Sequence, residues 1–254
     1  MVAGDIDGAI ASYERSVELD ADNENGRNFL FVLRTYEKRE VRIPMRDGVT
    51  LFTQIYTPRD DTKTWPILFK RTPYGIGWYG PTLYANSVGP NPEIARDGYI
   101  FVYQDVRGRY MSEGLYDNMR PHVPGDAAID ESSDTYDTIE WLLENVPNHN
   151  GKVGMWGTSY PGFYVTAAIP EAHPALVASL PQAPIADFYF DDLHHHGAFT
   201  LPYWIMTPLT GVQKEGLETE DWWQLPQPDT RDAYQFYMEL GPLKNSDRWY
   251  GDEN

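Results

Sequence analysis

A predicted strand that turns sharply into a helix around Ser159 constrains this chain more than any other feature. Residues 151–156 (Gly-Lys-Val-Gly-Met-Trp) have the composition of a short strand, and residues 160–168 begin a helix at once. The turn runs through residues 157–162, Gly-Thr-Ser-Tyr-Pro-Gly, so proline replaces the last glycine of a G-x-S-x-G pattern. Small residues let strand and helix approach closely, and a helix N-terminus favours negative charge developing beside it. We therefore predict that Ser159 is an exposed nucleophile.

Strands and helices alternate along the middle of the chain. Strands are predicted at 41–44, 51–56, 65–70, 99–105 and 176–183, and helices at 93–97 and 130–145. This alternation is typical of the α/β class, with a mainly parallel sheet covered on both faces. We assign residues 37–183 to this core. Residues 184–254 are rich in aromatic residues and proline and have weak periodicity, so we expect the start of a helical cap.

The N-terminal residues form a different pattern. Residues 4–20 predict an amphipathic helix, with Ala9, Ile10, Tyr13 and Val17 at helical spacing. The segment resembles the second helix of a tetratricopeptide repeat, and we treat residues 1–36 as a separate helical segment. Half a repeat cannot bury its apolar face without neighbours. It is therefore either a partner-binding helix or an edge helix that packs locally.

Composition excludes several classes of function. The chain has 20 basic and 38 acidic residues, a formal charge of -18, which disfavours binding to nucleic acids or anionic lipid. It has no cysteine, which excludes a cysteine nucleophile and thiolate metal sites. No apolar run approaches the ~20 residues of a membrane span, and no signal peptide is visible, so the compartment stays open. A neutral or cationic small molecule is the expected partner.

Several segments, in the same order, resemble one known family. It unites Xaa-Pro dipeptidyl-peptidases, cocaine-esterase-like (CocE/NonD) enzymes, glutaryl-acylases and α-amino-acid ester hydrolases. Besides the Ser159 turn, the matching segments are 43–51 (IPMRDGVTL), 71–74 (RTPY), 105–110 (DVRGRY), 137–142 (DTIEWL) and 191–199 (DDLHHHGAF). The last segment is most similar to the α-amino-acid ester hydrolase branch. The resemblance implies an incomplete α/β-hydrolase core over residues ~40–205.

The same resemblance implies roles for individual residues. Ser159 matches the acylated nucleophile, and Tyr74 matches a tyrosine whose hydroxyl donates to the oxyanion. The backbone N–H of Tyr160 is the expected second donor. Asp191 and Asp192 are candidates for binding a substrate ammonium group. Without the family match, we would interpret Tyr74 as an aromatic residue that anchors its loop. The resemblance implies no cofactor.

Other polar residues have more than one interpretation. Arg107 and Arg109 could bind a substrate carboxylate, but we expect structural ion pairs, because guanidinium groups suit buried carboxylates. The acids along residues 130–145 are expected to form a solvated helix face. His194 to His196 suggest a metal site, but adjacent side chains diverge, so we expect no metal.

The sequence lacks an evident catalytic base and acid. In α/β-hydrolases these follow the serine as a separate Asp or Glu and then a His. His173 and His194 to His196 follow Ser159, but none comes after an acid at the required interval. His122 precedes the serine and is expected to be structural. We expect the acid and base to lie beyond Asn254, so that this chain is a fragment with little esterase activity alone.

The sequence thus predicts a serine hydrolase that cleaves ester or amide bonds of a small molecule or short peptide through an acyl-serine intermediate. An α-amino-acid ester hydrolase or acylase is the favoured type, and an Xaa-Pro dipeptidyl-peptidase is the alternative. From another class, the chain could be an inert fragment or an interaction protein that docks through its N-terminal helix. The oligomeric state is undetermined.

Overall fold

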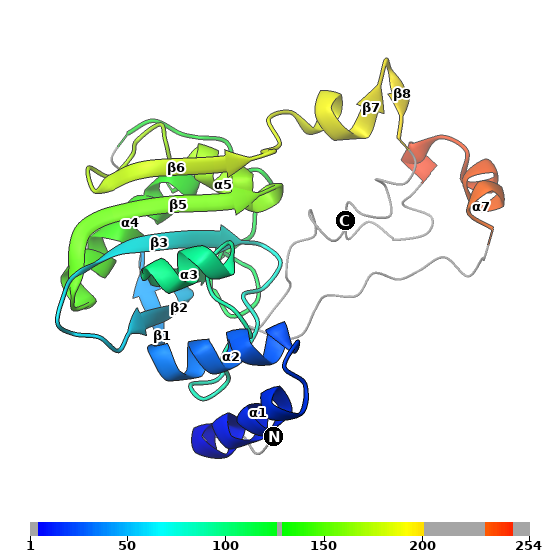
Figure 1. Cartoon of the computed structure of the whole chain (residues 1–254). Helices are drawn as coiled ribbons and strands as arrows, with labels where there is room; N and C mark the ends of the chain where they lie inside the picture. Colours follow the sequence, from blue (N-terminus) through cyan, green and yellow to red (C-terminus); the bar gives the residue numbers. More distant parts are fainter. Residues whose placement is uncertain (1–4, 126–128, 201–231, 246–254) are drawn as a thin grey trace.

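A six-stranded mixed sheet forms the centre of the protein (Figure 1). The computed structural model describes residues 5–125, 129–200 and 232–245. The strand order is β1-β2-β4-β3-β5-β6. The strands are β1 (Tyr36–Pro44), β2 (Thr50–Pro58), β3 (Trp65–Thr72), β4 (Ile100–Asp105), β5 (His149–Thr158) and β6 (Leu176–Gln182). The four strands from β3 to β6 run parallel, while β2 is antiparallel to both β1 and β4. The predicted α/β class with a mainly parallel sheet is confirmed.

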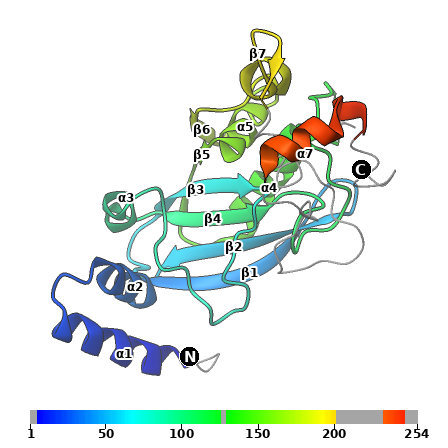
Figure 2. The same cartoon turned by 90° about the vertical axis from the view of Figure 1, so that its right-hand side faces the viewer.

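Helices cover both faces of this sheet (Figures 1 and 2). On one face, α4 (Glu131–Asn145) and α5 (Tyr160–Ala167) bury Ile139 and Val165 against Ile67, Phe69 and other strand residues. Helix α4 begins in a capping box between Asp130 and Ser133, which satisfies N–H groups that a helix start leaves without partners. On the other face, α3 (Pro92–Asp97) and two N-terminal helices complete a second core.

The N-terminal helices share that second core. Helix α1 (Ile6–Leu19) confirms the helix predicted there, and α2 (Glu24–Thr35) is a second helix that the periodicity did not predict. Phe29 and Val32 of α2 pack in one cluster with Tyr56 and Phe101 of the sheet. Residues on both sides of the proposed boundary at residue 36 therefore pack in the same hydrophobic core.

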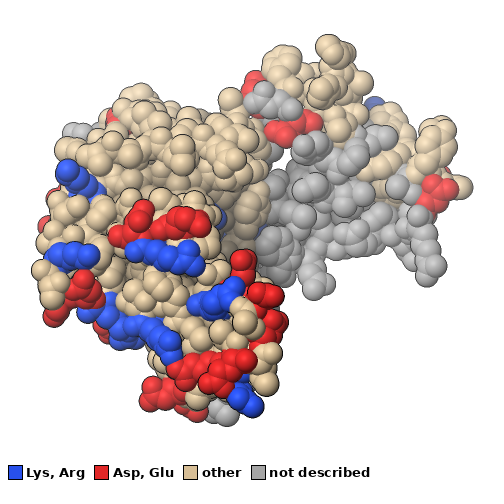
Figure 3. Space-filling view, viewed as in Figure 1, with Lys and Arg blue, Asp and Glu red and all other residues tan. Residues whose placement is uncertain are grey.

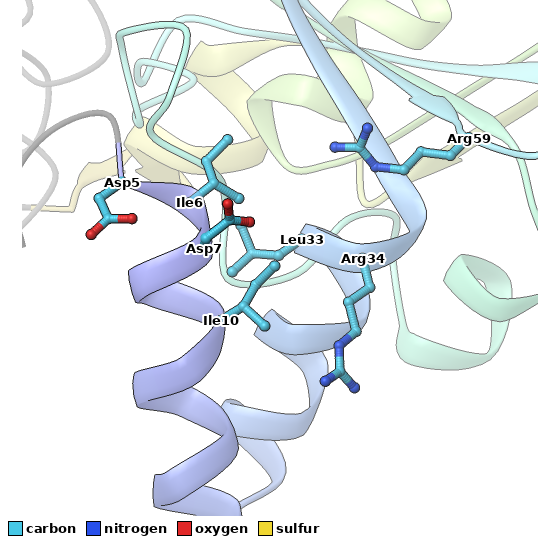
Figure 4. A pocket seen from close by; sticks show the side chains of 7 residues that line it. All are labelled: Asp5, Ile6, Asp7, Ile10, Leu33, Arg34 and Arg59. Atoms are coloured by element: carbon cyan, nitrogen blue, oxygen red, sulfur yellow. The ribbon is translucent and has the colours of Figure 1, made fainter.

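A cavity of about 530 Å³ lies where α1 meets the end of α2 (Figure 4). Its apolar wall contains Ile6, Ile10 and Leu33, and its charged residues are Asp5, Asp7, Arg34 and Arg59. Acidic and basic groups are balanced in number there, and none of the sequence-predicted site residues is among them.

Beyond β6 the described chain consists of short elements. A six-residue π-helix (Phe188–Leu193) leads into a hairpin of β7 (His194–His195) and β8 (Ala198–Phe199), which lies beyond the ends of β5 and β6 in Figure 1. Helix α7 (Ala233–Leu240) and a 3₁₀ turn (Leu243–Asn245) follow. Most of the predicted cap, residues 201–231 and 246–254, lies outside the described residues. Among those described, no helix has the length and apolar character of a membrane span.

Candidate active site

Ser159 occupies the junction between β5 and α5. It is the N-cap residue of α5, with φ 64° and ψ −125°, and its side chain makes no capping hydrogen bond. A positive φ is unusual for a residue other than glycine and costs on the order of 1–3 kcal/mol, so it persists only where the surroundings enforce it. The residue is exposed. The geometry therefore presents a hydroxyl that the helix does not use.

Two glycines permit this turn. A Cβ atom on Gly157 would lie 2.3 Å from the carbonyl oxygen of Pro161, and one on Gly162 would lie 2.7 Å from that of Gln182. The Ser159 N–H donates to the same Gln182 oxygen at 2.9 Å, which ties the turn to the end of β6. Pro161 lies in the first helical turn, where a missing N–H costs little. The departure from G-x-S-x-G is thus compatible with the turn.

Tyr74 lies in the loop after β3, and its hydroxyl lies near the Ser159 side chain, which acts to lower the pKa of Tyr74. Its N–H donates to the Thr72 hydroxyl oxygen at 3.1 Å. The buried carboxylate of Asp105 anchors the rest of the loop, since it accepts from Ile76 N at 3.0 Å and from the Tyr79 hydroxyl at 2.9 Å. The structure therefore brings two of the sequence-predicted residues together.

The surroundings of Tyr74 affect its acidity in opposite directions. Burial raises the pKa of Tyr74 above its ordinary value, while the nearby Ser159 side chain and the positive charge of Arg109 act against that rise. The Arg109 Nε donates to the carbonyl oxygen of Pro73 at 2.9 Å, immediately before Tyr74 in the chain. Tyr74 consequently remains a neutral hydroxyl at pH 7, able to donate a hydrogen bond.

Tyr160 is held from the opposite side. Its hydroxyl interacts with the Tyr116 hydroxyl at 2.8 Å, donates to Asn118 Oδ1 at 2.5 Å and accepts from Met119 N at 2.9 Å. Burial raises the pKa of Tyr160 to about 12. Its ring centroid is 6.2 Å from that of Tyr74, in an edge-to-face arrangement. Tyr160 is the first residue of α5, where backbone N–H groups point out of the helix start.

The arginines near this loop make mainly structural contacts. Arg107 pairs with Asp134 of α4 at 2.6 Å and with Asp47 of the β1–β2 turn at 2.7 Å, which confirms the ion pairs predicted for it. Arg109 is buried and lies 5.0 Å from the Tyr116 ring centroid, besides its bond to Pro73. The sequence did not predict that Arg109 would link the loops of Tyr74 and Tyr116, although it belongs to the matching segment 105–110.

Three of the histidines have partners other than Ser159. His122 pairs with Asp130 at 2.9 Å and His173 with Glu140 at 2.7 Å, while His194 stacks on Tyr189 with centroids 4.0 Å apart. Across residues 5–125, 129–200 and 232–245, no hydrogen bond joins a histidine to Ser159. In the same ranges, no group of three or more histidine, aspartate or glutamate side chains is placed to hold a metal ion.

The two candidate ammonium-binding aspartates belong to the π-helix before β7. The Asp192 side chain is partly buried, and no contact with Ser159 or Tyr74 is present among the described residues. The Asp191 side chain lies outside the described part of the structure.

A mainly parallel sheet with a serine at positive φ between strand and helix defines the class of α/β-hydrolase folds. Residues 47–248 match the sequence model of the X-Pro dipeptidyl-peptidase (S15) family. The chain belongs to this family.

Three relatives illustrate the likeness. The cocaine esterase of Rhodococcus sp. (strain MB1 Bresler) is 37% identical over 153 residues, 59% of this chain and 24% of that protein. The structure of an aminopeptidase from a marine sediment Thaumarchaeota archaeon has a TM-score of 0.70 and 36% identity, covering 86% of this chain. An α-amino acid ester hydrolase has a TM-score of 0.68 and 35% identity over 85% of this chain. This chain spans 36% of the length of each of the latter two.

Proposed function

We propose that this protein hydrolyses ester or amide bonds through an acyl intermediate on Ser159. The observation that carries the proposal is the placement of the Tyr74 hydroxyl near the Ser159 hydroxyl at a strained helix start. A hydroxyl donor in contact with the nucleophile is positioned for the oxyanion that forms when the nucleophile adds to a carbonyl group. The family relationship supports the same chemistry.

The proposed reaction has two halves. The Ser159 oxygen adds to the substrate carbonyl carbon while a base takes its proton, and the carbonyl oxygen becomes an oxyanion. Tyr74 and the Tyr160 N–H donate to that oxygen, and the start of α5 adds a favourable dipole. The C–O or C–N bond then breaks, and the leaving group takes the proton. Water repeats the sequence on the acyl-serine, releasing the acid and restoring Ser159.

The base and its orienting acid are proposed to lie outside the described residues. Both His122 and His173 already pair with carboxylates, and neither is bonded to Ser159. Activity is therefore measured on the whole protein.

An α-amino-acid ester or related acyl compound is the favoured substrate class. Asp191 and Asp192 are proposed to bind its ammonium group, in keeping with the matching segment 191–199. Release of Xaa-Pro dipeptides is the alternative, in line with the description of the family. Comparison of kcat/KM on an amino-acid methyl ester and on Ala-Pro-p-nitroanilide separates the two.

Replacement of the nucleophile is the primary test. Ser159→Ala is expected to remove p-nitrophenyl acetate turnover and the acetylated protein that mass spectrometry detects during turnover, because the variant has no oxygen to acylate. Ser179→Ala is the matched control: it removes an exposed serine hydroxyl from the neighbouring strand β6 and should retain activity. Full turnover by Ser159→Ala would refute the proposal.

A further inference from the structure

The segment that carries Tyr74 is fixed to the loop that follows β4. The carbonyl oxygen of Pro73, immediately before Tyr74, accepts a hydrogen bond from the Nε of Arg109 at 2.9 Å. A Cβ atom on Gly75, immediately after Tyr74, would lie 2.9 Å from the ring of Tyr110, so that ring packs directly against the Gly75 backbone. Two consecutive residues of one loop therefore hold Tyr74 from both sides.

The loop after β4 is itself tightly turned. The Arg109 N–H donates to the Val106 carbonyl oxygen at 3.0 Å, and the Ser112 N–H donates to the Arg109 carbonyl oxygen at 3.0 Å. Tyr110 has φ 47°, a conformation that residues other than glycine rarely adopt and that persists only where the surroundings enforce it. The Arg109 side chain therefore starts from a backbone that is fixed in place.

The guanidinium group of Arg109 lies among aromatic rings in the interior. In Figure 3 the charged side chains gather on the surface over α1 to α3, and few lie over β5 and β6, whereas Arg109 is only 4% exposed. Its guanidinium carbon lies 5.0 Å from the Tyr116 ring centroid and 5.7 Å from that of Tyr110. The positive charge acts to lower the pKa of Tyr74, Tyr110 and Tyr116, against the rise that burial causes. One buried cation thus acts on three tyrosines, and one of them is the proposed oxyanion donor.

Tyr116 extends this arrangement to the second proposed donor. Its hydroxyl lies 2.8 Å from the hydroxyl of Tyr160, the residue whose backbone N–H is proposed to donate to the oxyanion. Arg109 therefore contacts a neighbour of each donor: the Pro73 carbonyl next to Tyr74, and the Tyr116 ring next to Tyr160.

A second cavity, of about 430 Å³, lies next to Ser159. Tyr74 lines it, as do Thr158 and Pro161, on either side of the start of α5. Arg109 is not among the described residues that line this cavity. A substrate in the cavity would therefore meet Tyr74 directly, and Arg109 would affect it only through Tyr74.

We propose that Arg109 is the positioning residue of the oxyanion site, which aligns the Tyr74 hydroxyl with Ser159 and, through its positive charge, makes that hydroxyl a stronger hydrogen-bond donor. The inference rests on the proposed function, since it concerns a donor of that same site. A nearby cation favours the negative charge that a phenol oxygen gains as it donates. The effect is largest when the acceptor carries a full charge, as the oxyanion does in the transition state. Arg109 therefore contributes to kcat and hardly to KM.

A double-mutant cycle on the whole protein separates this role from a merely structural one. With p-nitrophenyl acetate, Arg109→Met is expected to lower kcat about ten- to hundredfold while KM changes little. In the Tyr74→Phe background, which has no hydroxyl to position, the same substitution should lower kcat less than about twofold. Equal losses in the two backgrounds would overturn the proposal. If turnover still depended on Ser159 in that case, the proposed function would stand, whereas full turnover by Ser159→Ala would refute the proposed function and this inference with it.

Two further variants test the charge and the specificity of the effect. Arg109→Lys keeps the positive charge and should recover part of the kcat that Arg109→Met loses, so equal kcat values for the two variants would overturn the role of the charge. Arg42→Met is the matched control: Arg42 also donates to a backbone carbonyl, that of Met111 at 2.9 Å, and lies 5.6 Å from the Phe52 ring centroid, but it is exposed. Its kcat should equal that of the wild type. Urea unfolding checks that each variant is folded, and if Arg109→Met is not, Arg109→Lys, which lacks the planar guanidinium group, is taken through the same cycle.

Discussion

The hydroxyls of Ser159 and Tyr74 lie near each other although 85 positions separate the two residues in the chain. Each is fixed by its own backbone: Ser159 by a positive φ at the start of α5, and Tyr74 by a loop that Thr72 and Asp105 anchor. Because both partners are fixed before substrate arrives, little reorganisation is needed when the oxyanion forms. Tyr74 is therefore expected to stabilise the transition state more than the bound substrate.

Tyr74→Phe tests that expectation. The variant keeps the ring and its edge-to-face contact with Tyr160 but loses the hydroxyl, so kcat for p-nitrophenyl acetate should fall by about 10²–10³ while KM changes little. Tyr99→Phe is a suitable control, because Tyr99 belongs to the second core and does not line the cavity next to Ser159. A rise in KM with unchanged kcat would indicate that Tyr74 only binds the ground state.

At the scale of elements, the close approach of β5, α5 and β6 creates the strained turn. The approach depends on residues without a side chain, because the positions that a Cβ atom would occupy on Gly157 and Gly162 are filled by backbone atoms. Backbone cannot give way as the end of a flexible side chain can. The turn and the helix that follows it are therefore a single structural unit, and Ser159 owes its position to all three elements.

Gly157→Ala is expected to destabilise this unit by about 1–3 kcal/mol or more, because its methyl group would overlap the Pro161 carbonyl. The measurement is the free energy of unfolding in urea, together with loss of Ser159 acylation. Gly154→Ala is the matched control on the same strand, where the nearest heavy atom to the new methyl carbon would be 3.4 Å away. Equal stability of the two variants would contradict the packing argument.

At the scale of the whole molecule, ion pairs of the buried Arg107 connect elements that are distant in sequence. Arg107, which follows β4, pairs with Asp134 of α4 and with Asp47 of the β1–β2 turn. Partial desolvation of the exposed Asp47 opposes its ionisation, but the Arg107 guanidinium and backbone hydrogen bonds outweigh that effect and hold the pKa of Asp47 below its ordinary value. A carboxyl group whose pKa is depressed in the folded state stabilises the protein at pH values above its unfolded pKa of about 3.9. This stabilisation is lost as the pH falls through the folded-state pKa.

Asp47→Asn should therefore be less stable than the wild type at pH 7, and the difference should shrink as the pH is lowered from 5 to 3. Urea unfolding at several pH values measures it. Asp61→Asn, an exposed change in the β2–β3 loop, should leave the wild-type pH dependence in place. A stability difference between Asp47→Asn and wild type that does not vary with pH would refute the linkage.

Local patterns determined most of the hydrolase core and its nucleophile. The alternation of strands and helices, and the glycines around Ser159, depend on interactions between residues close in sequence, and these are visible in the chain itself. Helix α2 was not predicted, because its apolar residues serve a core completed by Tyr56 and Phe101. The family resemblance suggested Tyr74, but residue patterns alone favoured a loop anchor.

Only the tertiary structure decided which distant groups meet. Ser159 and Tyr74 are brought together because β3 and β5 are neighbours in the sheet and their carboxyl ends share one edge. Arg109 donates to the Pro73 carbonyl oxygen and lies over the Tyr116 ring, so it contacts two loops that are separate in the sequence. The sequence alone specified a serine in a sharp turn. The residues that surround this serine were decided by the assembled sheet, because residues far apart in sequence become neighbours only through strand order and packing.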